Sequence, residues 1–301
     1  MGKLYIGNEY VPFTVKDERR PLQDYDGSEP LCIKVGGSNS RNRFTDASIT
    51  SVDLSFLTEL NDPTATEATG LLAKCFDSNT NLVTASFSKL KTINSPYALF
   101  QCFYDCTNLT AVSFQSLEVI NGHDAFWKIF ANCSSLTTIS LPKLREINCL
   151  LGDDVIAGCT SLETLSFPAL TIINYRYAFS SSLYMAENLT TVSFPALTTI
   201  TGDSVFDEAF RNDTSLTTVS FPSLQSITGD NIFIDAFDGC ESLESLYFPA
   251  LTHIEGTNDH PFYDFGNSGS LESLHFRADK QAEFEQIMEI SVHNLDVYYD
   301  L

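Results

Sequence analysis

The sequence predicts an α/β repeat solenoid, a curved stack of short parallel strands with short helices, and two regularities support this. The pattern Leu-x-x-(Val/Ile/Leu)-x-(Phe/Leu) recurs through most of the 301 residues, with its first leucines 27, 27, 26, 27, 27, 27 and 28 positions apart. A second pattern, Leu-x-x-Ile, follows in most copies. A unit of this size cannot bury its apolar side alone, so neighbouring units must stack.

The leucine-rich repeats occupy residues 49–276 in about nine copies of about 27 residues, and the first copy, from Ile49 with Val52 and Leu54, is weak. Within a copy, the Val-Ser-Phe alternation has the period of a half-buried strand, with Val and Phe inward and Ser outward. The full copies begin at Leu82, Leu109, Leu136, Leu162, Leu189, Leu216, Leu243 and Leu271.

The last part of each repeat carries apolar pairs four residues apart, such as Leu99 with Phe103. That spacing places both side chains on one face of a helix, so we expect a short helix in each repeat. Acidic residues at the preceding turns suit helix caps, and the alternative is a calcium site supplied by adjacent repeats. These acidic residues are Asp153, Asp154, Asp203 and Asp230.

Both ends differ from the repeats. Residues 1–48 begin with two short apolar runs around Gly7 and Asn8, which predicts a β-hairpin followed by a polar linker. This region would serve either as an anchor to another protein or as an N-terminal cap. Residues 277–301 are expected to form a C-terminal cap, with an amphipathic helix over 278–290 and a closing strand that contains Val297 and Tyr298.

The charge is strongly acidic, with 39 Asp and Glu against 17 Lys and Arg and a net charge of −22. Residues 1–48 hold seven of each kind, which leaves 32 acidic and 10 basic residues beyond them. This balance argues against nucleic acid or an anionic membrane as partner. Neither a signal peptide nor a run of about 20 apolar residues is recognisable. These features favour the cytoplasm or a virion, and a removed leader would leave the cell surface open.

Four of the eight cysteines share one position, three residues before the first leucine of a copy. In other copies this position holds Asn79, Ala186 or Asp213. We expect small buried thiols there, because stacked parallel side chains keep the Cβ atoms too far apart for a disulfide. No Cys-x-x-Cys is present, so we expect no zinc site. The four cysteines are Cys106, Cys133, Cys159 and Cys240.

Two segments, 133–142 (Cys-Ser-Ser-Leu-Thr-Thr-Ile-Ser-Leu-Pro) and 214–222 (Thr-Ser-Leu-Thr-Thr-Val-Ser-Phe-Pro), resemble the BspA-like leucine-rich repeat family. So does Ala-Phe-Asp-Gly-Cys at 236–240. The resemblance covers about residues 49–301, with about four more residues in each unit than is usual. It implies a protein of cell-surface adhesion, host-protein binding or contact with other cells.

The sequence holds no grouping typical of catalysis, so we expect no enzyme, no catalytic residues and no cofactor. The leading hypothesis is a protein-protein interaction or adhesion module with an extended acidic surface. The alternative is a structural component of a larger assembly, such as a phage virion, anchored through residues 1–48. Large aromatic and basic residues favour binding hot spots, although half or more of them could instead pack in the core. The candidates are Tyr97, Tyr104, Trp127, Tyr175, Arg176, Tyr177, Tyr184, Tyr247 and His275.

Overall fold

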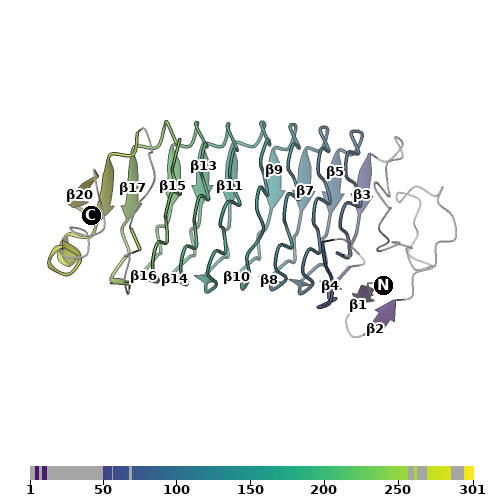
Figure 1. The fold of residues 1–301 in the computed structure, drawn as a ribbon, viewed down its shortest axis with the longest axis horizontal. Coiled ribbons are helices and arrows are strands. Elements are labelled where there is room, and N and C mark those ends of the chain that lie inside the picture. The colour runs from purple at the N-terminus through teal and green to yellow at the C-terminus, as the bar shows by residue number, and fades with distance from the viewer. Residues whose placement is uncertain are drawn as a thin grey trace.

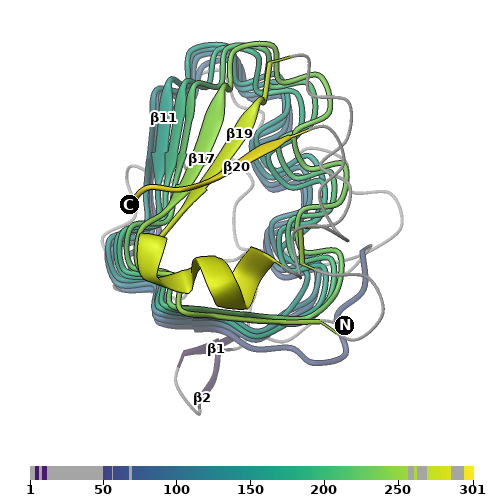
Figure 2. The same ribbon diagram turned by 90° about the vertical axis from the view of Figure 1, so that its left-hand side faces the viewer.

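The computed structural model of the chain is a parallel β-solenoid in which successive repeats lie side by side along the long axis (Figure 1). Each repeat contributes a first strand, a second strand and a turn segment. The end-on view shows the first strands on one side of the stack and the turn segments on the opposite side (Figure 2). The structure describes residues 4–6, 9–11, 50–55, 57–67, 70–256, 261–262, 270–285 and 295–301.

The first strands coincide with the predicted Val-Ser-Phe positions, and neighbours pair in parallel with equivalent residues aligned, as Val112 does with Ile139. Val112 and Phe114 are fully buried while Ser113 between them is partly exposed, so the predicted facing is confirmed. The first strands are β3 (Ser51–Asp53), β5 (Thr84–Ser86), β7 (Ala111–Ser113), β9 (Thr138–Ser140), β11 (Thr164–Ser166), β13 (Thr191–Ser193), β15 (Thr218–Ser220), β17 (Ser245–Phe248) and β19 (Ser273–Phe276).

The second strands form one continuous eight-stranded parallel sheet. The last apolar residue of each repeat's Leu-x-x-Ile pattern is buried in the core, as Ile120 and Ile147 are, and asparagines that follow some of these strands extend the pairing with side-chain hydrogen bonds. Asn148 donates to Asn121 at 2.9 Å, and Asn121 donates to Asn94 at 2.7 Å. The second strands are β4 (Glu59–Leu60), β6 (Thr92–Ile93), β8 (Val119–Ile120), β10 (Glu146–Ile147), β12 (Ile172–Ile173), β14 (Thr199–Thr201), β16 (Ser226–Thr228) and β18 (His253–Glu255).

The turn segments differ from the predicted short helices. In residues 97–106 successive N–H groups alternate between two acceptors: Phe100 donates to the Tyr97 carbonyl at 3.2 Å, and Gln101 donates to the Trp127 carbonyl of the next repeat at 2.9 Å. Every fourth residue has a positive φ, including Gln101 at 48° and Asp105 at 56°. A chain of turns with this period also places residues four apart on one side, so the spacing of apolar pairs does not distinguish it from a helix.

Phenylalanines at the end of the first strands stack in a column through the core. Phe87 and Phe114 lie 4.7 Å apart between ring centroids, and Phe167 and Phe194 lie 5.1 Å apart. Between these pairs the position is Leu141, and the spacing of repeats falls to 26 there. The first-strand sheet also breaks at this point, because β9 ends one sheet and β11 begins the next.

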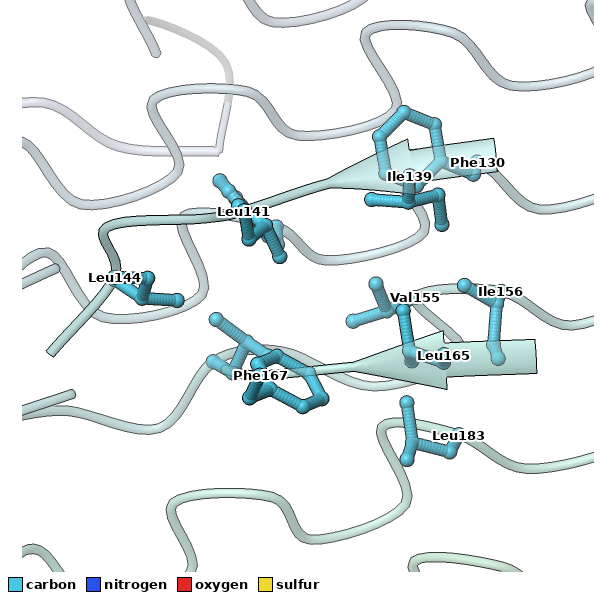
Figure 3. A pocket seen from close by; sticks show the side chains of 11 residues that line it. Phe130, Ile139, Leu141, Leu144, Val155, Ile156, Leu165, Phe167 and Leu183 are labelled. Atoms are coloured by element: carbon cyan, nitrogen blue, oxygen red, sulfur yellow. The ribbon is translucent and has the colours of Figure 1, made fainter. Parts of the chain in front are cut away.

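A small apolar void of about 20 Å³ lies at the interruption. Leu141 and Ile139 line it from one repeat, and Leu165 and Phe167 line it from the next (Figure 3). An apolar void with room for about one water stays dry, so the void is a packing defect and has no capacity for a ligand.

The cysteine position is buried, as expected. The thiol of Cys133 donates to the carbonyl of Phe103 at 3.0 Å, and the thiol of Cys159 donates to that of Phe130 at 3.1 Å. The seven cysteines in the described residues are free thiols. At the shared position, each of the thiols of Cys106, Cys133, Cys159 and Cys240 therefore joins two adjacent repeats by a hydrogen bond.

At the N-terminal end, β1 (Leu4–Ile6) and β2 (Glu9–Val11) pair antiparallel, at the position of the predicted hairpin, and β1 lies beside β4. At the other end, Ala278–Lys280 forms a 3-10 turn and residues 281–285 are helical. Phe284 is buried against Phe276, with ring centroids 5.8 Å apart. Strand β20 (Asp296–Tyr299) pairs in parallel with β19. Figure 2 shows this helical segment and β20 across the end of the stack. Residues 286–294 of the predicted helix and loop lie outside the described residues.

Candidate functional site

The outward face of the first strands is lined by serine and threonine, and threonines directly before these strands form hydrogen bonds between repeats. Thr137 donates to the Thr110 carbonyl and Thr217 to the Thr190 carbonyl, both at 3.1 Å. Each of these bonds reaches one repeat back, so the hydroxyls hold the stack together. From β5 to β15 the outward positions of the first strands carry small side chains.

The C-terminal end of the same face carries three stacked rings. Tyr247, His275 and Tyr298 occupy aligned positions on β17, β19 and β20. The ring centroids of Tyr247 and His275 lie 4.5 Å apart at 18°, and those of His275 and Tyr298 lie 5.0 Å apart at 19°. The two tyrosines are 49% and 45% exposed. We call Tyr247, His275 and Tyr298 the aromatic stack.

Hydrogen bonds fix the central ring of the aromatic stack. Nδ1 of His275 lies 2.9 and 3.1 Å from the carboxylate oxygens of Asp300, and Nε2 lies 3.2 Å from Oγ of Ser273. Because a carboxylate only accepts hydrogen bonds, Nδ1 carries the proton. The hydroxyl of Ser273 also lies 2.7 Å from that of Ser245. The imidazole therefore has one orientation, and the tyrosines stack on a fixed ring.

Ser273, His275 and Asp300 have the connectivity of a nucleophile, a base and an orienting acid. Two features oppose catalysis by this group. Ser273 is only 8% exposed, and both faces of the imidazole are covered by the tyrosines. Strand β19 pairs on both sides, with β17 and β20, so its backbone N–H groups take part in the sheet and not in an oxyanion hole. The group orients a ring.

Most of the other predicted site residues lie on the turn segments. Trp127 packs against Phe100 and Tyr97, with ring centroids 5.3 and 6.2 Å away. Burial and the neighbouring Asp124, which forms a hydrogen bond with Tyr97, raise the pKa of that tyrosine. Trp127 is partly buried and its Nε1 has no acceptor among the described residues. These three rings pack chiefly on one another.

The remaining candidates are scattered along the same side. Oη of Tyr175 lies 3.1 Å from Nε2 of His123, and the Arg176 guanidinium lies 6.0 Å from the ring centre of Tyr177, which is exposed. Tyr104 accepts a long, 3.4 Å hydrogen bond from Asn132. Tyr184 is partly buried. The predicted residues thus fall into two groups on opposite sides of the solenoid: Tyr97 and Trp127 pack together among the turn segments, and Tyr247 and His275 stack on the face of the first strands.

The acidic turn residues do not cap helices, because the described turn segments contain none. Asp154 has a positive φ of 51° and pairs with Lys128 at 3.2 Å. Asp203 accepts a 3.0 Å hydrogen bond from the backbone N–H of Asp230. Among the residues that the structure describes, no three His, Cys, Asp or Glu side chains are grouped to hold a metal ion.

Tyr298 and Asp300 belong to the site, although their sequence pattern predicts only a closing strand. The alternation of Val297 and Tyr299, which both pack on the core, is the signal that places Tyr298 outward. The sequence Glu272, Ser273, His275 gives no indication that His275 contacts Asp300. That contact depends on the register between β19 and β20.

The model of the BspA type leucine rich repeat region matches the chain in six copies, over residues 41–128, 101–236 and 204–286. The chain belongs to this family. No curated protein matches this BspA-type chain in sequence. No helix within the described parts of the chain has the length and apolar character to cross a membrane.

Several solved structures resemble the BspA-type chain at 16% identity. A leucine rich cell surface protein from Faecalibacterium prausnitzii A2-165 covers 83% of this chain and 78% of its own, with a TM-score of 0.27. The pneumococcal vaccine antigen PcpA covers 84% and 79%, with a TM-score of 0.30. An internalin (InlF) from Listeria monocytogenes str. 4b F2365 covers 81% and 68%, with a TM-score of 0.29. At these scores none superposes closely on this chain.

Proposed function

We propose that this BspA-type chain is a non-enzymatic protein-protein interaction or adhesion module that uses an extended acidic repeat surface. The observation that carries the proposal is the aromatic stack, two exposed tyrosines on a hydrogen-bonded histidine, on a face that is otherwise lined by small side chains. Tyrosine is enriched among the residues that dominate binding energy. Long repeat arrays present such surfaces over several units at once.

The acidic charge supports the same proposal. Beyond residue 48 there are 32 acidic against 10 basic side chains, so the repeats carry a net negative field. Such a field speeds encounter with basic partners and weakens as salt increases.

The test is capture with the full chain as bait from extracts of its native source and from the surfaces of neighbouring cells, followed by mass spectrometry. An unrelated protein of similar net charge is the control bait. We expect one or a few proteins to be retained by this chain and not by the control bait. Raised salt should release them. Recovery of the same proteins on both baits would contradict the proposal.

The alternative function is a structural part of a larger assembly, anchored through residues 1–48. Their balanced charge favours it, since this stretch alone lacks the acidic excess. The proximity of β1 to β4 favours the competing role of an N-terminal cap. Deletion of residues 1–40 separates the two. An anchor predicts an unchanged melting temperature and lost association, whereas a cap predicts a lower melting temperature or aggregation.

A further inference from the structure

Exposed carboxylates lie on or directly before the three strands that carry the aromatic stack. Glu244 and Glu272 directly precede β17 and β19, and the Glu272 N–H donates to the Glu244 carbonyl at 2.9 Å. Asp296 begins β20, and its N–H donates to the Glu272 carbonyl at 2.8 Å. These three side chains are exposed and form no ion pair with the residues that the structure describes. The hydroxyl of Tyr298 donates to Asp296 at 3.4 Å, and the three carboxylates together add negative charge to this end of the array.

The two basic side chains that follow β19 are paired with other carboxylates. Arg277 donates two 2.8 Å hydrogen bonds to the carboxylate of Asp279, and Lys280 lies 2.6 Å from Glu283. Both cations are committed to carboxylates at the start of the C-terminal helical segment. Within the described residues, the carboxylates of Glu244, Glu272 and Asp296 are therefore left without a paired cation.

The outer ring of the stack has one free face. Tyr247 stacks on His275 on one side, and on the other side the equivalent residue of the preceding repeat is Ser220. A serine is too small to cover a phenol ring, which agrees with the 49% exposure of Tyr247. A tyrosine face attracts a cation through its ring quadrupole.

We propose that the aromatic stack, together with Glu244, Glu272 and Asp296, binds an extended basic segment of a partner protein. One arginine of the segment lies against the free face of Tyr247, and a second cationic side chain reaches the carboxylates. The inference rests on the proposed function, because it assigns the chemistry of the partner at that surface.

Geometry and charge favour arginine. Glu244 lies three positions before Tyr247, about 10 Å along the chain. A planar guanidinium stacks on an aromatic ring and also binds a carboxylate through two hydrogen bonds, whereas an ammonium group offers a point charge.

Fluorescence anisotropy of the purified full chain tests the proposal. The probe is a dye-labelled peptide of three Arg-Gly-Gly units, with Lys-Gly-Gly and Glu-Gly-Gly versions beside it. We expect the arginine peptide to bind most tightly, the lysine peptide more weakly and the glutamate peptide not at all. Raised salt should weaken the binding, since these charges are exposed.

Tyr247→Ser is the decisive variant, because serine is the native residue at the equivalent position of six other repeats, so the fold tolerates it. It should weaken binding of the arginine peptide by about two- to fivefold. Tyr177→Ser, which removes an exposed tyrosine on the opposite side, is the matched control and should leave binding unchanged. The double substitution Glu244→Gln and Glu272→Gln should weaken binding further and reduce its salt dependence.

Equal binding by the Tyr247→Ser and wild-type chains, with both folded by circular dichroism, would overturn the inference. So would binding of the glutamate peptide or an equal loss in Tyr177→Ser. These outcomes do not depend on partner capture. Peptide binding without any captured protein would instead refute the broader interaction function and leave the site assignment standing.

Discussion

Oδ1 of Asp213 accepts a 2.7 Å hydrogen bond from the backbone N–H of Ala186, and both residues occupy the position that is cysteine in four other repeats. At a cysteine the same N–H donates within its own repeat, as Cys133 does to the Phe130 carbonyl at 3.0 Å. Asp213 is fully buried, and its Oδ2 has no partner among the described residues. Burial raises the pKa of this carboxyl well above its usual range.

The raised pKa of Asp213 makes the stability of the solenoid depend on pH. The folded-state pKa of Asp213 lies above the unfolded value of about 4. The protonated carboxyl therefore makes its full contribution to stability below about pH 4. It is lost as pH rises through the folded pKa. Asp213→Asn keeps an acceptor for Ala186 and cannot ionise, so it should stabilise the protein at pH 8 by about 1–3 kcal/mol and have little effect near pH 4.

Thermal melts of Asp213→Asn and wild type at the two pH values measure this difference. Half-buried Asp207, whose pKa is raised to about 6 by burial and by nearby Glu208 and Asp235, adds a dependence of the same sign. Asp207 is present in both proteins, so its pH dependence cancels when the two are compared. An equal shift in melting temperature at both pH values would show that ionisation of Asp213 is irrelevant.

Leu141→Phe should stabilise the protein by about 0.5–1.5 kcal/mol, because it restores the missing ring of the phenylalanine column and fills the adjacent void. Leu144→Phe is the control. Leu144 lines the same void but belongs to a column in which the other repeats also have leucine, so a ring there should cost about 1–3 kcal/mol through overpacking. Chemical denaturation measures both, and destabilisation by both would mean that the void cannot accept a ring.

Phe221→Ala should cost about 3–5 kcal/mol. The ring of Phe221 is buried and stacks between Phe194 at 5.2 Å and Phe248 at 5.9 Å. Ser220→Ala, one residue away on the outward face, should change the free energy of unfolding by less than about 0.5 kcal/mol. Urea titrations compare the two, and similar losses would mean that the strand facing is wrong.

The buried thiols should resist modification in the native protein and react after denaturation. Burial raises the pKa of Cys159 to about 12, and it also raises that of Cys106 to about 12. Little thiolate is therefore present at pH 8. Thiol titration of the denatured, unreduced protein should find most of the eight cysteines free. Recovery of two or more disulfides would contradict this expectation.

Periodicity was sufficient to predict the strands and their facing from the sequence. The period of two in Thr-Val-Ser-Phe decides which side chains are buried, and Val192 and Phe194 are accordingly at zero exposure. The turn segments could not be predicted in the same way. A four-residue spacing of Phe206 and Phe210 fits a helix and a series of turns equally well, and only hydrogen bonds to the next repeat decide between them.

The sequence predicted only part of the candidate site, because the rest again depends on contacts that periodicity does not encode. Tyr247 and His275 are recognisable because they replace small residues at a repeated outward position. Tyr298 follows at an irregular spacing, so its place beside His275 depends on the pairing of β20 with β19. Asp300 reaches His275 through that same pairing. Contacts between non-periodic segments are set by tertiary structure, which a repeat pattern does not contain.

The interruption at Leu141 divides the array. In a linear stack each unit is held only by its two neighbours, so cooperativity passes along the chain through successive interfaces. The interface between β9 and β11 lacks the strand pairing present on either side and has a void beside it. It is therefore held by the second strands and the turn segments, as is the interface between β15 and β17, which also lacks first-strand pairing. A force applied along the axis would load these two interfaces without the first-strand ladder that holds the others.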